Sequence, residues 1–322
     1  MSSISSSPSP SPSILILREL RARATRILAH PARSELGVLR RAAEKVITYV
    51  NHVPQELRTR KQFLPRFGKL PYRRGEIGWI RDGWDNPAHW MSFESALEAL
   101  LQKPELFDGI SFVCKRADSE NGTQIVAGDL DCCVDPGSGA VTRWAREVLE
   151  RIRPFYTELS PSRTGIRFFA MGELPGSEPM LSLESAEELD ADLRERIKRA
   201  KDDYDRSHRV KQRGERKAAD IKQKLELFVS NKQVTLTGWK ISEFCYPPED
   251  RTGAIRELLN HDHGHAQEIT RALESVRHSG KAWLSEKAPI RIEDVIDTRG
   301  FERTGDQLAG PHPVHGSTTG QN

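Results

Sequence analysis

Hydrophobic positions near the N-terminus recur at helical spacing, after a leader of serine and proline. Residues 1–13 are almost entirely Ser and Pro and bury too little apolar surface to offset the entropy of ordering, so we expect disorder. From residue 14 to 50, apolar side chains recur at helical intervals among arginines, which predicts two short basic amphipathic helices. They suit a DNA-binding or partner-binding arm, and equally a packed helical hairpin with a solvated face.

The central stretch alternates strand-like and helix-like segments from residue 53 to about residue 239, which predicts one α+β domain. Ser92 is placed to cap a helix, and a second helix is expected over residues 141–152. The β-rich segments, separated by turn-forming residues, predict three hairpins: 109–114 with 123–131, 156–159 with 166–171, and 225–228 with 234–236.

The pattern changes before and after the last of these hairpins. Residues 182–224 carry dense charge of both signs and few large apolar side chains, which predicts a long, exposed helical insertion. The Gly- and Pro-rich tail from residue 305 is expected to be disordered. We therefore expect a leader and arm over 1–50, a main domain over 51–245 that contains the insertion, and a short helical segment with a tail over 246–322.

Composition predicts more about where the protein is found than about what it binds. The 322 residues carry a formal net charge of +3, which permits nucleic-acid binding through a local patch without demanding it. The cysteines lack C-x-x-C spacing and are expected to be reduced thiols: Cys114, Cys132, Cys133 and Cys245. No apolar run approaches the roughly 20 residues that span a bilayer, so we expect a soluble, cytoplasmic protein with no membrane partner.

The sharpest chemical signal is an apolar strand over residues 125–131 that ends in Asp129 and Asp131. Positions two apart on a strand project from the same face, so both carboxylates can hold one cation. Hard oxygen ligands suit Mg²⁺ or Mn²⁺, and such a cation is what nucleotidyl transfer requires.

The D-x-D pattern alone also fits other proteins. It occurs in nucleotide-sugar glycosyltransferases, in phosphatases of the haloacid-dehalogenase type, and in plain turns. The phosphatase pattern needs Thr or Val two residues after the second Asp, where this chain has Cys133. The glycosyltransferase reading stays open on this motif, and hydrolysis of sugar-nucleotide donors discriminates it.

The order of further segments resembles the N-terminal domain of bifunctional DNA primase-polymerases, in the archaeo-eukaryotic primase superfamily. The resemblance covers about residues 53–240 and includes the D-x-D strand, Ser160-Pro161-Ser162-Arg163-Thr164-Gly165-Ile166-Arg167, Leu225-Glu226-Leu227-Phe228 and Val234-Thr235-Leu236-Thr237-Gly238. It implies an α+β fold with a primase-like core, an RRM-like sheet unit, and flanking helical N- and C-terminal segments.

The resemblance also implies roles for individual residues. Asp129, Asp131 and Glu226 would bind two Mg²⁺ or Mn²⁺ ions and carry catalysis. The residues implied to bind the nucleotide are Ser160, Ser162, Arg163, Thr164, Gly165, Arg167 and Lys232. The implied reaction is template-directed transfer from an NTP or dNTP to a 3′-hydroxyl on single-stranded DNA, in replication of a phage, plasmid or mobile element. A G-x-x-x-x-G-K-[ST] loop is absent from the sequence, so any replicative helicase would be a separate partner.

Two positions depart from the family pattern. The family usually has Gly where this chain has Arg163, which predicts either a different turn or extra positive charge over the nucleotide, and commonly His where it has Arg167. These changes favour one alternative function, a catalytically degenerate primase fold that binds single-stranded DNA or acts as a replication-initiation adaptor.

Two clusters carry weaker hypotheses. Trp79, Trp84 and Trp90 with Tyr72 could stack on template bases, although core packing explains them equally well. The segment from His261 to His265 has metal-ligand residue types at close spacing, and a polar loop explains it without any metal.

Overall fold

The protein is described from a computed structural model. The structure describes residues 11–29, 37–116, 124–175, 179–208, 216–260, 302–304 and 307–309. The chain divides into two compact units, residues 1–262 and 263–322. In the second unit, β12 (Glu302–Thr304) pairs antiparallel with β13 (Gln307–Ala309), so part of the tail predicted to be disordered forms strand.

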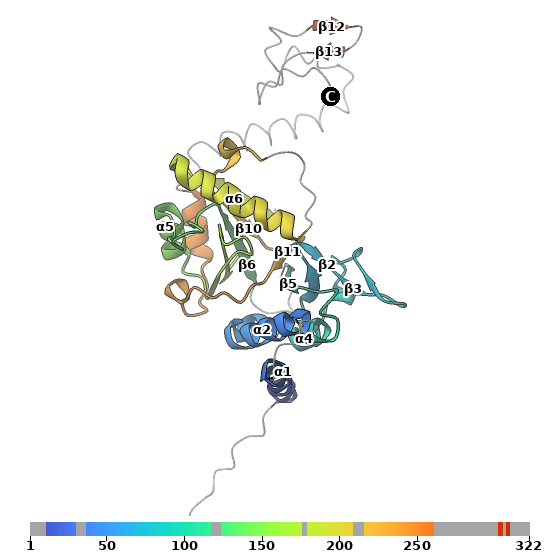
Figure 1. Cartoon of the computed structure of the whole chain (residues 1–322). Coiled ribbons are helices and arrows are strands. Elements are labelled where there is room, and N and C mark those ends of the chain that lie inside the picture. The colour runs from blue at the N-terminus through green and yellow to red at the C-terminus, as the bar shows by residue number, and fades with distance from the viewer. Residues whose placement is uncertain are drawn as a thin grey trace, which may run out of the picture. The chain divides into compact units, whose positions relative to one another are not determined.

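Two antiparallel sheets form the framework of the first unit, which confirms the α+β class (Figure 1). The first sheet has the order β11-β5-β1-β2, with bounds Lys232–Thr235, Gly109–Cys114, Phe63–Phe67 and Leu70–Pro71. The second has the order β7-β8-β6-β10-β9, with bounds Tyr156–Leu159, Ile166–Met171, Ile125–Asp131, Lys224–Phe228 and Met180–Glu184. A small ribbon pairs β3 (Arg73–Arg74) with β4 (Trp79–Ile80).

Helices cover both sheets. Their bounds are α1 Pro12–Ala29, α2 Gly37–His52, α3 Gln55–Arg58, α4 Phe93–Gln102, α5 Arg143–Ile152 and α6 Ala191–Ser207, and residues 252–260 are also helical. Short 3₁₀ turns lie at Pro87–His89, Ala218–Asp220 and Ser242–Phe244. The Ser92 hydroxyl accepts from the Ser95 N–H at the start of α4, as predicted. None of the described helices is long and apolar enough to cross a lipid bilayer.

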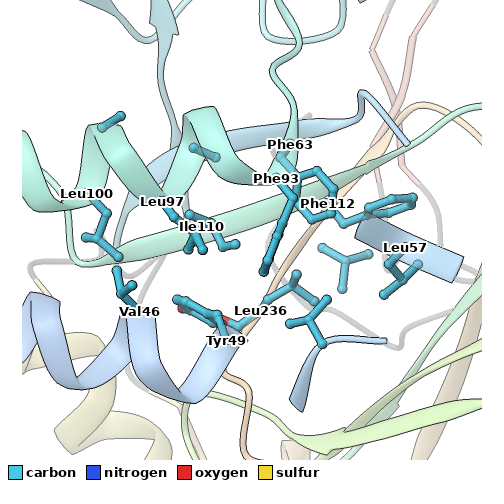
Figure 2. Close-up of a cluster of buried hydrophobic side chains, with 14 of the residues drawn as sticks. Val46, Tyr49, Leu57, Phe63, Phe93, Leu97, Leu100, Ile110, Phe112 and Leu236 are labelled. Carbon is cyan, nitrogen blue, oxygen red and sulfur yellow. The ribbon is translucent and has the colours of Figure 1, made fainter. Parts of the chain in front are cut away.

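The first core lies between the first sheet, α2 and α4 (Figure 2). Tyr49 of α2 is fully buried beside Ile110 of β5, and its hydroxyl donates to the Leu236 carbonyl. Leu20 and Ala24 of α1 are buried in the same cluster. The predicted N-terminal helices are therefore present as a packed pair that belongs to this core, and residue 50 is not a structural boundary.

The second core lies on the opposite face of the second sheet, under α5 and the helix at residues 252–260. Val126 and Leu130 of β6 point into it, whereas Ile125 and Ala127 point into the first core. An added Cβ at Gly128 would lie only 2.1 Å from the Phe168 ring, so close packing requires glycine there. Because β6 is buried on both faces, the position of its terminal acids is rigidly set.

Two of the three predicted hairpins are wrong. The β5 strand pairs with β1 and β11 of the first sheet, whereas β6 lies in the second sheet. Likewise β10 pairs with β6 and β9, whereas β11 pairs with β5. In both cases the chain crosses between sheets. Only the hairpin of β7 and β8 is confirmed.

The predicted exposed insertion over 182–224 is also wrong in part. Its first residues complete β9, which pairs along the whole of β10. Ile197 of α6 is fully buried against Ile221 and Cys132. Figure 1 shows α6 in yellow lying across the ends of the sheets. This segment is therefore an integral part of the fold.

Candidate functional site

One row of polar side chains crosses the second sheet from β7 to β9. Register pairs Glu158 with Arg167, Arg167 with Asp129, Asp129 with Glu226, and Glu226 with Ser182. Directly paired residues project from the same face of a sheet. Asp129 shares its face with Ile125 and Ala127 of the first core, so this row faces the first sheet.

The three predicted acids are neighbours in this arrangement. Asp129 lies opposite Glu226, and Asp131 follows two residues later on the same face of β6. Each carboxylate has a cationic partner. The Arg167 Nε is 3.7 Å from Asp129 Oδ1, Lys201 Nζ is 2.7 Å from Asp131 Oδ1, and Lys224 Nζ is 2.7 Å from Glu226 Oε1.

The pKa values of the two aspartates are shifted in opposite directions. Desolvation raises the pKa of the Asp129 carboxyl; the Arg167 guanidinium opposes this, and the Asp131 and Glu226 carboxylates add to it. Desolvation also acts on Asp131, but the charge and hydrogen bond of the Lys201 ammonium, together with the Arg167 and Lys69 charges, outweigh it, so the pKa of Asp131 is lowered. Asp131 is therefore held in its ionised form more firmly than Asp129.

Asp129 and Asp131 open into a cleft of about 340 Å³ between the two sheets and α6, whereas Glu226 is not among the residues that line it. Among the described residues, five cationic and three acidic side chains line it: Lys69, Arg167, Lys201, Arg216 and Lys232, and Asp129, Asp131 and Asp205. Ser160, Ser162 and Thr235 also line the cleft. The cationic side chains of the cleft outnumber the acidic ones, and hydroxyl groups lie beside them. This combination suits a phosphorylated ligand.

The loop between β7 and β8 is pinned to the residues that follow Asp131. The Thr164 carbonyl accepts from the N–H groups of Cys133 and Val134, at 2.9 and 3.1 Å. A Cβ on Gly165 would lie 2.5 Å from the Leu130 carbonyl oxygen, so only glycine permits this approach. The Ser160 and Ser162 side chains therefore stand beside the D-x-D strand, with Ser160 Oγ accepting from the Gly165 N–H.

Arg163 takes the backbone conformation of a glycine but points away from the cleft. Its φ is 60°, in the left-handed region that favours glycine. Its guanidinium lies 4.7 Å from the centroid of the Trp239 ring, and Arg163 lines a separate pocket with Trp239. The predicted role of Arg163 as a nucleotide contact therefore has no geometric support, and Thr164 is fully buried rather than exposed to the cleft.

Arg167 and Lys232, both predicted to bind the nucleotide, line the cleft. The Arg167 Nη1 donates to the Thr235 carbonyl at 2.7 Å and to the Thr235 hydroxyl, which ties the second sheet to β11 of the first. The Arg167 Nε is buried and has no hydrogen-bond partner among the described residues. Lys232 Nζ is 3.8 Å from Glu226 Oε2. Both cations lie on the cleft wall and are ion-paired there with acids, Arg167 with Asp129 and Lys232 with Glu226.

Sequence reasoning missed Glu158 and the contributions of α6. Glu158 is fully buried, and its carboxylate accepts from the N–H groups of Thr237 and Gly238 at 2.9 and 2.8 Å, so it fixes the end of the T-x-T-G segment. Burial raises the pKa of Glu158 despite these bonds. Lys201 could not be found from sequence, because nothing local connects it to Asp131.

The donor chemistry fits a divalent cation. Carboxylate oxygens of Asp129, Asp131 and Glu226 are the hard ligands that Mg²⁺ and Mn²⁺ prefer. Within the described residues, no three His, Cys, Asp or Glu side chains are drawn together into a ligand cluster. Lysine ammonium groups engage Asp131 and Glu226, so these carboxylates would exchange an ammonium for the metal.

Three hypotheses from the sequence remain, on the aromatic residues, on the cysteines and on the segment from His261 to His265. Tyr72 and Trp90 are buried, Trp79 packs edge-on to Phe107, and the Trp90 Nε1–H donates to the Trp84 carbonyl, so these rings serve packing. All four cysteines are free, as predicted. The segment from His261 to His265 lies outside the described residues.

No protein-family model matches this chain, and no curated protein shows significant sequence similarity to it.

Proposed function

We propose that the chain is a primase-polymerase that transfers a nucleoside monophosphate from an NTP or dNTP to a 3′-hydroxyl on a single-stranded DNA template. The observation that carries the proposal is the pair Asp129 and Asp131 on the wall of a cationic cleft that Ser160 and Ser162 also line, with Glu226 directly opposite Asp129 in the sheet. The primase-like resemblance of the sequence adds to this, because the same residues carry it.

Each group has a defined task in this reaction. Asp129, Asp131 and Glu226 would hold Mg²⁺ or Mn²⁺, which lowers the pKa of the attacking hydroxyl and neutralises the triphosphate. Arg167 and Lys232, which line the cleft, bind the phosphate oxygens. Pyrophosphate leaves as the new phosphodiester bond forms.

One specific observation favours the adaptor as a second candidate. Lysines neutralise Asp131 and Glu226, so the cleft can bind a nucleic-acid phosphate without any catalytic step. The two candidates share the cleft and differ in whether the acids take up a metal.

Primer extension on a primed single strand with Mg²⁺ or Mn²⁺ tests the proposal. Asp129→Ala with Asp131→Ala should abolish products, whereas Asp192→Ala with Asp203→Ala, which removes two exposed acids of α6, should not. Failure of folded native protein to extend, while it still binds single strands, would leave the adaptor. Turnover of sugar nucleotides instead would support the glycosyltransferase alternative.

A further inference from the structure

A second cavity, here called the α2 pocket, adjoins the cleft on the side of α2. Its volume is about 390 Å³, and it is lined by Arg41, Glu44, Lys45, Thr48, Tyr49, Arg66, Pro161, Tyr204, His208, Thr237 and Trp239. Pro161 and Tyr204 line both this pocket and the cleft, so one ligand can extend from one into the other.

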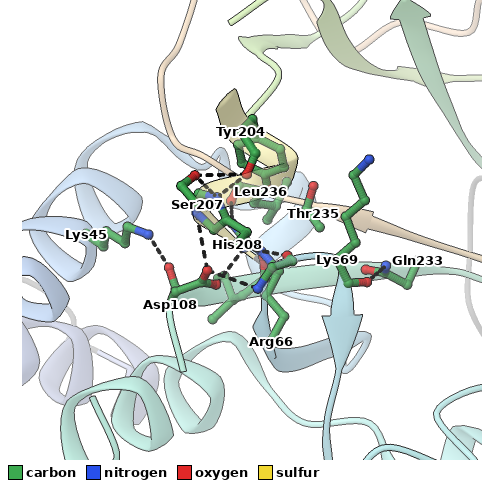
Figure 3. Close-up of polar contacts among 12 residues, drawn as sticks. Lys45, Arg66, Lys69, Asp108, Tyr204, Ser207, His208, Gln233, Thr235 and Leu236 are labelled. Atoms are coloured by element: carbon green, nitrogen blue, oxygen red, sulfur yellow. Dashed lines mark hydrogen bonds and ion pairs between the residues drawn. The ribbon is translucent and has the colours of Figure 1, made fainter. Parts of the chain in front are cut away.

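Asp108 organises the polar side of the α2 pocket (Figure 3). Its Oδ1 accepts from Arg66 Nη1 at 2.7 Å, its Oδ2 lies 3.7 Å from His208 Nε2, and its backbone carbonyl accepts from the Lys45 ammonium. The Arg66 charge is thereby matched by a carboxylate. Glu44, the acid that lines the pocket, is 3.5 Å from Arg40.

Two cations of α2 are left without a carboxylate. Neither Arg41 nor Lys45 forms an ion pair with any residue that the structure describes. Burial, reinforced by the nearby Arg66 guanidinium, lowers the pKa of Lys45 to about 8. The pocket therefore holds more positive charge than its own acids balance, and an anion would relieve this excess.

Aromatic rings provide the other walls. Tyr49, Tyr204 and Trp239 line the pocket, and Trp239 is 38% exposed. The Tyr204 hydroxyl is buried and has no hydrogen-bond partner within the described ranges. The Tyr204 ring is stacked on His208, with centroids 4.1 Å apart, and Tyr49 is fully buried, so Trp239 is the exposed ring of the pocket. An exposed ring beside unpaired cations matches a planar base with an attached phosphate.

We propose that the α2 pocket binds one nucleotide unit, with its base against Trp239 and its phosphate on Lys45 and Arg41. The inference deepens the proposed function, on which it rests for the identity of the ligand: the unit belongs to the single strand that continues into the cleft past Pro161. A free mononucleotide has the same chemistry, and competition separates the two sources.

Binding of a fluorescein-labelled oligo(dT) to the full chain in EDTA, followed by anisotropy, tests the α2 pocket without metal or catalysis. Arg41→Met, Lys45→Met and Trp239→Leu should each weaken binding by at least about fivefold. Arg40→Met is the matched control, because Arg40 neighbours Arg41 on α2 but does not line the pocket. Arg41 is exposed, so its variant should fold.

The outcomes separate this inference from the proposed function. Equal affinity in all variants, or the same loss in Arg40→Met, overturns the α2 pocket whatever the polymerase assay gives. Loss in the pocket variants alone supports it even if no extension occurs. Competition by millimolar dTMP identifies a free nucleotide as a ligand, and its absence identifies a unit of the strand.

Discussion

Asp129 and Glu226 lie directly opposite each other in the antiparallel register of β6 and β10. They are 97 positions apart in the sequence, yet pairing puts their side chains on one face beside Asp131. This pairing adds a third acid, on the neighbouring strand, to the face that carries the D-x-D pattern.

Removing the third acid should weaken metal binding. Glu226→Gln keeps the shape of the side chain but removes its charge, so Mn²⁺ affinity, measured by electron paramagnetic resonance, should fall at least about tenfold. Glu184→Gln on the neighbouring strand β9 is the control and should bind normally. Unchanged affinity in Glu226→Gln would exclude this residue as a ligand.

Removing the competing lysine should have the opposite effect. The Lys201–Asp131 ion pair at 2.7 Å must break when a cation takes the carboxylate. Lys201→Met should therefore tighten Mn²⁺ binding by about threefold to tenfold, which corresponds to roughly 1 kcal/mol. Lys198→Met, on the same helix but paired with Asp202, should leave affinity unchanged. Weaker binding in Lys201→Met would contradict the exchange.

Substitution of Arg163 and of Arg167 should affect nucleotide binding to different extents. Arg163 faces Trp239, so Arg163→Ala should leave binding of a fluorescent nucleoside triphosphate within about twofold. Arg167 lines the cleft beside Asp129, so Arg167→Met should weaken binding by at least about tenfold. Comparable losses in both variants would place Arg163 back at the nucleotide.

Gly165 should tolerate no side chain. A Cβ would lie 2.5 Å from the Leu130 carbonyl oxygen, so Gly165→Ala should lower the free energy of unfolding by about 1–3 kcal/mol in urea titration. Gly253→Ala meets no atom within 4 Å and lies in a helix, so it should be neutral or stabilising. Equal stability of the two variants would show that the loop can move away from β6.

Lys45 should make stability depend on pH above neutrality. Its pKa is about 8 in the folded protein and 10.5 when unperturbed, so between these values the unfolded chain binds more protons and stability rises with pH. Lys45→Met should abolish this rise and stabilise the protein by about 1–3 kcal/mol at pH 7. Urea titrations at pH 7 and pH 9.5 measure both effects. A destabilised Lys45→Met would assign Lys45 a structural role.

Local sequence patterns were enough to predict the α+β class, the D-x-D strand, most of the described helices, six of the described strands, and the β7–β8 hairpin around Ser160–Gly165. These features follow from local periodicity and turn chemistry, which neighbouring residues alone express. The strands β1 and β9 were not predicted.

Which strands pair and which side chains meet depends on the packing of the whole fold. The crossings between sheets after β5 and β10, the contact of Lys201 with Asp131, and the burial of Glu158 all depend on residues far apart in the chain. Turn residues can join neighbouring strands of one sheet or strands of two different sheets. Because both faces of β6 are buried, in two different cores, the chain crosses from one sheet to the other here. Long-range packing, which no local pattern encodes, therefore assembled the cleft from locally predictable parts.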